Sequence, residues 1–157
     1  MSSTGIWQKF VSNSDYQPKR SVLFPAEILW AEATKCYDAS ANLACCICAR
    51  GAIEAALHQA KTRTAAGSGG SVAFLEDTGW GELRTWAKGN GLIDPTFEKR
   101  IDNARDMGNL GAHLGQKIDQ AYMSGGTPKL DVTPREAYNA LETCAEMIGR
   151  IAKQRWP

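Results

Sequence analysis

The segment from Ala41 to Leu57 constrains the fold of this chain more than any other, because almost every residue in it is apolar or small. Its only charged residues are Arg50 and Glu54. A helix that is hydrophobic nearly all the way around is normally buried at the centre of a domain. We therefore predict that this segment is the central and most buried helix of the fold.

Arg50 and Glu54 need partners if that helix is buried, because a buried charge is costly unless it is paired. One interpretation is a salt bridge between the two residues, which lie one helical turn apart. In the other interpretation, Arg50 reaches the segment from Asn109 to His113 and forms part of a polar pocket there. The two charges lie on the same side of the helix as three aliphatic residues, Leu43, Ile47 and Leu57. Both interpretations remain open.

Three segments carry the signature of a helix start. Pro25 suits the first helical position and precedes a helical pattern from Ala26 to Asp38. Asp94 can cap a helix that has Pro95 at its first position. The sequence Thr133-Pro134-Arg135-Glu136 combines a capping box with a proline at the first helical position. The predicted final helix then repeats apolar residues at spacings of four and three, namely Ala137, Leu141, Cys144, Ile148 and Ile151.

The remaining segments complete a prediction of an all-α fold. A helical pattern runs from Phe74 to Trp86, and glycine-rich loops are expected at residues 65–71 and from Gln116 to Leu130. No segment alternates apolar and polar residues as a half-buried strand does. We predict a bundle of about five helices at residues 25–157, preceded at residues 1–24 by an N-terminal arm that packs through its aromatic residues.

Arg105, Asn109 and His113 are spaced by four residues within the helix predicted to begin after Asp94, so they fall on one side of it. An arginine can hold a phosphate, an imidazole can transfer a proton, and an amide can orient either group. These are the candidate catalytic residues. The alternative is that they satisfy buried backbone groups and have a structural role.

Glycines interrupt the same helix at Gly108, Gly111 and Gly115. Each costs about 1 kcal/mol relative to alanine in a helix interior, so the fold must compensate for them. They indicate a close approach between helices, a break in the backbone near Gly108, or the end of the helix.

The run Arg105-x-x-Gly108-Asn109-x-x-Ala112-His113, preceded by Arg50-x-x-x-Glu54, resembles the HEPN superfamily. More narrowly, it is similar to the HEPN-like domain of unknown function that occurs free-standing in bacteria and fused to restriction-endonuclease subunits. The resemblance covers the chain from about Phe24 to Arg155. It implies a HEPN-like helical bundle and a homodimer, with the segment from Gly108 to Gly115 near the two-fold axis.

The resemblance also implies two functions. Many HEPN proteins are metal-independent endoribonucleases of defence or toxin–antitoxin systems, in which Arg105 would stabilise phosphate charge, Asn109 would orient groups and His113 would transfer a proton to or from RNA. In catalytic members the arginine lies closer to the histidine than the seven residues that separate Arg105 from His113, and Gly108 stands where they carry that arginine. This departure favours an accessory or regulatory interaction module of a bacterial defence or restriction-type system, which would bind a protein partner.

Composition limits the possible partners. Lysine and arginine number 18 against 17 aspartate and glutamate, a formal net charge of +1, so the chain has no bulk attraction to nucleic acid or to a membrane. Any contact with RNA would be local. The candidate basic clusters are Lys99-Arg100 and a C-terminal group of Arg150, Lys153 and Arg155.

The cysteines and the termini point to a reducing compartment. Five cysteines without framework spacing argue against an exported disulfide scaffold, and Cys45, Cys46 and Cys48 have no further ligands with zinc-site spacing. We expect these three to be buried thiols. No signal peptide and no apolar run of membrane length is visible. We therefore expect a cytoplasmic protein without a membrane contact, a metal ion or a cofactor.

Overall fold

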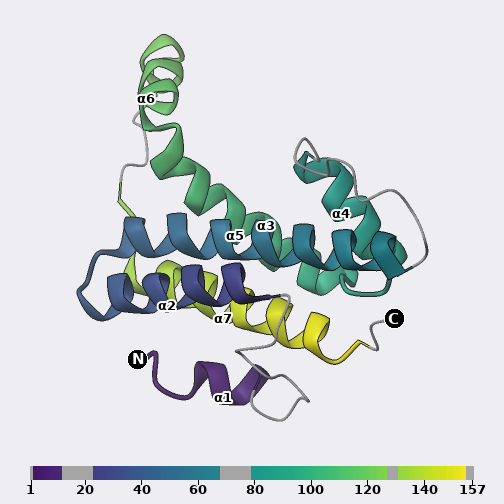
Figure 1. Ribbon diagram of the computed structural model, residues 1–157. Coiled ribbons are helices and arrows are strands. Elements are labelled where there is room, and N and C mark those ends of the chain that lie inside the picture. The colour runs from purple at the N-terminus through teal and green to yellow at the C-terminus, as the bar shows by residue number, and fades with distance from the viewer. Residues whose placement is uncertain (1, 12–22, 68–78, 127–130, 155–157) are drawn as a thin grey trace.

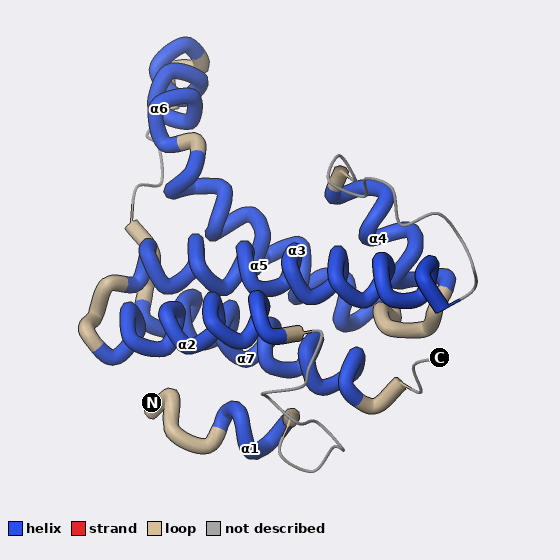
Figure 2. The backbone as a smooth tube through the Cα atoms, viewed as in Figure 1, coloured by secondary structure: helices blue, strands red, loops and turns tan. Residues whose placement is uncertain are grey.

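The chain is a bundle of α-helices in a computed structural model, which describes residues 2–11, 23–67, 79–126 and 131–154. These residues contain seven helices and no strand, so the predicted all-α class is confirmed. Figure 2 shows their arrangement, with helices in blue and loops in tan. The helices are α1 (Ile6–Phe10), α2 (Phe24–Asp38), α3 (Asn42–Gly67), α4 (Trp80–Gly89), α5 (Pro95–Ala112), α6 (Leu114–Met123) and α7 (Pro134–Ala152).

Helix α3 runs through the middle of the bundle and packs against α2, α4, α5 and α7 (Figure 1). Its central position agrees with its apolar sequence. The prediction that it is the most buried helix is wrong, however, because the side that carries Arg50 and Glu54 is only half-buried and Ile47 is 39% exposed. Helix α7 is more fully buried, and the residues predicted to form its core side, Ala137, Leu141, Cys144, Ile148 and Ile151, are all buried.

The helix starts predicted from capping residues are confirmed for α5 and α7. The Asp94 carboxylate accepts hydrogen bonds from the backbone N–H groups of Thr96 and Phe97, at 3.0 and 2.9 Å. At the start of α7, Thr133 and Glu136 form the reciprocal capping box, with bonds of 2.9 and 3.2 Å. These bonds satisfy N–H groups that have no partner within the helix.

Three other boundaries differ from the prediction. Helix α3 continues ten residues beyond Leu57, to Gly67. Helix α4 begins at Trp80, after the extended Gly79, with φ −69° and ψ 162°, and the part of the predicted helix from Phe74 to Thr78 lies outside the described residues. Helix α6 occupies most of the segment expected to be a loop after Gln116. It ends at Met123, and the turn that follows contains Gly125, whose φ is +70°. The remaining loop signals, at residues 68–71 and 127–130, lie outside the described residues.

The N-terminal segment packs on the bundle through α1. Trp7 lies against Trp30 of α2, with ring centroids 4.8 Å apart, and Phe10 packs on the core. Helix α1 also contacts α7, where the backbone of Phe10 lies so close to Gly149 that a side chain at that position would collide with it. The division into an arm at 1–24 and a domain at 25–157 stays a prediction, and Tyr16 lies outside the described residues.

Helix α6 continues upward from the end of α5 and stands away from the rest of the bundle (Figure 1). Its main contacts in the described chain are with α5. Among the described residues, no helix has both the length and the apolar character that a membrane span requires.

Candidate functional site

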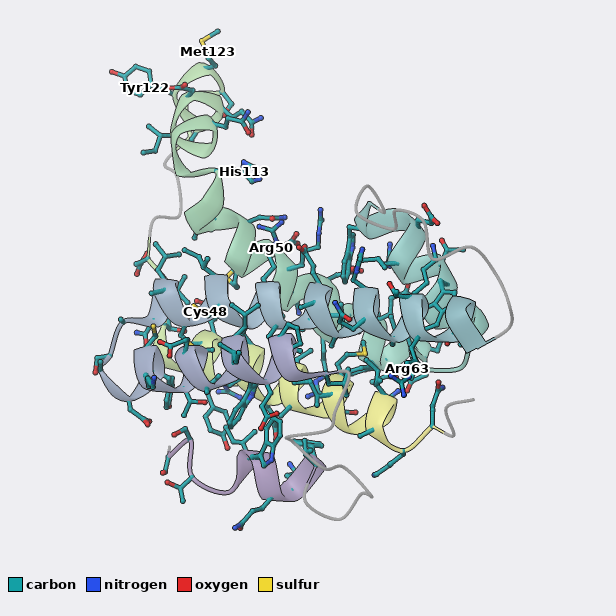
Figure 3. The ribbon with its side chains drawn as sticks, in the orientation of Figure 1. Cys48, Arg50, Arg63, His113, Tyr122 and Met123 are labelled. Carbon is teal, nitrogen blue, oxygen red and sulfur yellow. The ribbon has the colours of Figure 1, made fainter. Side chains whose placement is uncertain are left out.

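The three residues predicted to share one helical stripe do not lie on one continuous helix. Helix α5 carries Arg105 and Asn109 and ends at Ala112. His113 is the joint between α5 and α6, with φ −125° and ψ 33°, and its backbone N–H donates to the carbonyl of Asn109 at 2.9 Å. His113 is exposed, and Figure 3 shows its imidazole pointing outward from this joint. A break in the helix therefore exists, but at His113 rather than near Gly108.

Arg105 lies against an aromatic ring. The central carbon of its guanidinium is 5.4 Å from the centroid of the Trp80 ring, at the start of α4. Its Nε atom is buried and has no hydrogen-bond partner among the described residues. The side-chain oxygen of Asn109, one turn further along α5, is in the same situation.

The contacts of Arg50 agree with the first interpretation, the ion pair with Glu54, and its contact with α5 is at Gly108, outside the segment from Asn109 to His113. Its Nε donates to Glu54 Oε1 at 3.0 Å, which is the predicted ion pair. The stem of the same side chain lies against Gly108 of α5. A Cβ atom at Gly108 would be 2.5 Å from the Cβ of Arg50 and 2.9 Å from the carbonyl oxygen of Cys46. Gly108 therefore permits the close approach of α5 to α3.

A groove of about 690 Å³ opens between α3, α4 and α5. Its lining includes Arg50 and Glu54 from α3 and Arg105 from α5, so three of the five predicted residues come together. Asn109 and His113 are not among the described residues that line it. The groove also has an apolar part, formed by Ala55, Leu83 and the ring of Trp80.

Two residues of this groove, His58 and Trp80, were not predicted as site residues. His58 follows Glu54 by four residues and continues the stripe that Arg50 begins on α3. This spacing of four residues is visible in the sequence, but the predicted helix ended at Leu57 and therefore did not include His58. Trp80 has no comparable signal, because its place beside Arg105 depends on how α4 packs against α3 and α5.

The predicted basic clusters do not form a free cationic patch in the described residues. Arg150 binds Asp94 and Glu146, both at 2.9 Å, and Arg100 binds the same Glu146 at 2.5 Å. The Arg150–Asp94 and Arg100–Glu146 pairs connect α5 and its cap with α7, and the Arg150–Glu146 pair lies within α7. Lys99 and Lys153 are exposed, and Arg155 lies outside the described residues.

The cysteines do not form a metal centre in the part of the chain that the structure describes. No three His, Cys, Asp or Glu side chains gather there in a way that could hold a metal ion. Cys45 and Cys46 are buried as predicted, whereas Cys48 is only partly buried. Burial raises the pKa of the Cys45 and Cys144 thiols above the usual range, which disfavours the reactive thiolate.

The arrangement can hold an anion and stack a planar group, and it places an exposed imidazole beyond the groove, at the joint of α5 and α6. Comparison with known proteins gives no further guide to its role, because no protein-family model, curated protein or solved structure matches the chain.

Proposed function

We propose that this chain is a HEPN-like helical module that works by association: it forms a homodimer through α6 and serves as an accessory or regulatory subunit of a bacterial defence or restriction-type system. The family assignment rests on the motifs around Arg50, Glu54, Arg105, Asn109 and His113. The mode of action rests on the structure of α6.

The observation that carries the proposal is the exposure of apolar side chains on α6. Tyr122 and Met123, at its end, are 87% and 90% exposed, and Ile118, one turn before Tyr122, is 37% exposed. Figure 3 shows Tyr122 and Met123 at the tip of the projecting helix. Large apolar side chains grouped in this way are typical of an interaction surface.

The length of α6 supports the same conclusion. It has 10 residues, and isolated helices shorter than about 12–15 residues are marginal in water. Among the described residues α6 contacts mainly α5, so this part of the protomer supplies little of the packing that stabilises most protein helices. A second copy of α6 would supply it.

A homodimer is the simplest assembly for this surface, since two-fold homodimers are the commonest oligomers and use the same patch twice. Gly108, which was expected near the two-fold axis, is occupied within the protomer by its contact with Arg50. The proposed interface therefore lies further along the chain, at Ile118, Tyr122 and Met123.

The test is sedimentation equilibrium of the wild-type protein beside two matched variants. Tyr122→Glu places a charge in the proposed interface. Ile28→Glu is the control, because it places the same charge at an apolar residue of α2 that is 47% exposed and lies outside the interface. We expect a dimer that Tyr122→Glu weakens by at least about tenfold, which is about 1.4 kcal/mol, and that Ile28→Glu leaves unchanged. A wild-type protein that is monomeric at every concentration would refute the proposal.

A metal-independent endoribonuclease is the second candidate, and the outward-pointing imidazole of His113 is the observation that favours it. In a dimer joined through α6, the two His113 residues would lie at the base of the interface. His113 would then transfer a proton at the ribose 2′-hydroxyl, Arg105 would stabilise phosphate charge, and Asn109 would orient the phosphate. Arg105 lies about two turns before the end of α5, at about 1.5 Å per residue, and His113 follows that end, so the second protomer would have to complete the site.

RNA cleavage in the presence of EDTA tests this second candidate. Cleavage by the wild-type protein that is lost in both His113→Ala and Arg105→Ala would establish a nuclease. Equal cleavage by all three proteins would show a contaminant. We expect no cleavage by the isolated protein, because Arg105 and His113 do not line a common groove.

A further inference from the structure

We infer that Cys36 of α2 and Cys48 of α3 form a redox-active dithiol, which a small disulfide such as glutathione disulfide oxidises to a covalent bond between the two helices. The inference goes beyond the proposed module, since it assigns a covalent modification to helices that association through α6 does not use.

The two cysteines lie where α2 and α3 pack side by side as an antiparallel hairpin (Figure 1). A turn at residues 39–41 joins the helices, and the backbone N–H of Ala41 in this turn donates to the carbonyl of Cys36 at 2.8 Å. Across the hairpin, the Cys36 and Cys48 thiols are hydrogen-bonded to each other. A disulfide requires two cysteine side chains that point toward each other. The folded chain therefore holds the two sulfur atoms next to one another before any oxidant arrives.

Exposure separates this pair from the other cysteines. Cys36 and Cys48 are partly exposed, whereas Cys45, Cys46 and Cys144 are buried. A disulfide reagent must reach the sulfur atom that attacks it, so the partly exposed pair is the one open to exchange in the folded protein. Burial raises the pKa of the Cys48 thiol, so little thiolate is present at neutral pH and exchange is slow. The reduced form then gains no stabilisation as a thiolate, which favours the disulfide at equilibrium.

The oxidation proceeds by two exchange steps. The thiolate of one cysteine attacks a sulfur atom of the reagent, so that a mixed disulfide forms, the sulfur–sulfur bond of the reagent breaks and one small thiolate leaves. The second cysteine then attacks the protein sulfur of the mixed disulfide, which forms the Cys36–Cys48 bond and releases the second small thiolate. The protons of the two protein thiols pass to the released thiolates, so the protein loses two electrons and the reagent gains them. In reducing compartments, such disulfides are usually transient and catalytic or redox-sensing.

Mass spectrometry of the full-length protein tests the inference after equilibration in glutathione buffers of increasing oxidised fraction. Acid stops the exchange, and free thiols are then alkylated in denaturant. We expect a linked peptide that contains Cys36 and Cys48, with at least about ten times more of this bond than of glutathione mixed disulfide, because the neighbouring thiol acts at a high effective concentration. Cys144 should remain open to alkylation throughout, and dithiothreitol should restore both thiols of the pair.

Two variants accompany the wild-type protein. Cys36→Ser should leave Cys48 reduced or bound to glutathione, with no linked peptide. Cys45→Ala is the matched control, because Cys45 is a buried cysteine on the same helix as Cys48, and this variant should form the Cys36–Cys48 bond as the wild type does. Oxidation should also raise the midpoint of thermal unfolding of the wild type, since the bond constrains the unfolded chain, and Cys36→Ser should show no such rise.

Several results would overturn the inference. These are two free thiols in the most oxidising buffer, mixed disulfides at both cysteines without a linked peptide, and a bond that joins a different pair of cysteines. A linked peptide that appears only when Cys144 also reacts would have the same meaning, since the bond would then require unfolding. The mapping of the wild type does not depend on either variant, and circular dichroism checks the fold of both.

Discussion

Gly108 sets the distance between the two helices that carry the candidate site. Without a side chain, it lets the stem of Arg50 and the backbone of Cys46 lie against α5. Beside this contact, Arg50 pairs with Glu54 one turn along α3. The cost of a glycine in the helix interior is therefore offset by close packing, and the residue has a structural reason to be glycine.

Gly108→Ala is expected to lower the free energy of unfolding by about 1–2 kcal/mol. Overpacking costs about 1–3 kcal/mol, and the better helix propensity of alanine returns up to about 1 kcal/mol. Chemical denaturation measures the change. Gly81→Ala is the control, because a Cβ atom there meets nothing within 4 Å, and it should stabilise the protein by about 0.4–1 kcal/mol. Equal effects of the two substitutions would contradict this account of Gly108.

Glu54→Ala is expected to cost only about 0.2–1 kcal/mol of stability. The side chains of Arg50 and Glu54 are 23% and 32% exposed, so water screens the ion pair and would solvate the arginine left behind. Had the pair been fully buried, as the apolar sequence around it suggests, the loss would be about 3–5 kcal/mol. A denaturation midpoint that gives this larger loss would show that the groove is closed in solution.

At the scale of whole elements, Arg150 ties α7 to the start of α5. Its guanidinium donates to the carboxylate of Asp94 at 2.9 Å and to the carbonyl of Leu92 at 3.0 Å. The pKa of Asp94 is lowered, first by the backbone N–H of Phe97 and then by Arg150. The folded state therefore favours ionised Asp94, and this contribution is present above the unfolded pKa and lost as the pH falls through the folded value.

Asp94→Asn is expected to make the protein less stable at neutral pH, because asparagine keeps the cap acceptor and loses the charge that faces Arg150. Thermal melts of both proteins across a range of pH measure the difference. It should shrink as the pH falls below about 3.9, the ordinary aspartate value, and disappear once Asp94 is protonated in the folded state. A difference that stays constant into strong acid would mean that the charge has no role.

Helix starts were predictable because their signals are local. Asp94-Pro95 and Thr133-Pro134-Arg135-Glu136 carry their own hydrogen-bond partners within four residues. The sequence predicts a loop in place of α6 because Ser124 and Gly125 favour a turn, although in the structure they follow only the end of the helix. Its isolation from the bundle also depends on tertiary structure, which a local pattern does not contain.

The candidate site was predictable only in part, for a related reason. Arg50 and Glu54 stand out as the only charged residues between Ala41 and Leu57, whereas Arg105 lies among other charged residues and is singled out only by its spacing from Asn109 and His113. The groove forms where three helices meet, and Trp80 enters it through the packing of α4. The position of His113 depends on where α5 breaks, and helical spacing alone predicted no break at that residue.

In the molecule as a whole, α6 is the described helix from α2 to α7 that has the least packing against the rest of the protomer. The other described helices from α2 to α7 pack on one another around α3 or α7, whereas α6 projects with its apolar residues exposed (Figure 1). If a second copy covers it, the protection of its backbone must depend on protein concentration, because dimers dissociate on dilution. A helix that is stable by itself would show no such dependence.

Hydrogen–deuterium exchange of the α6 amides, measured above and below the concentration at which the protein dimerises, therefore tests whether the chain associates through α6. Exchange in α6 (Leu114–Met123) should slow at high concentration, while exchange in α2 (Phe24–Asp38) stays the same. Tyr122→Glu should remove the difference in α6. Exchange of α6 that is identical at every concentration, and identical in wild type and Tyr122→Glu, would contradict the account of this chain as a module that associates through α6.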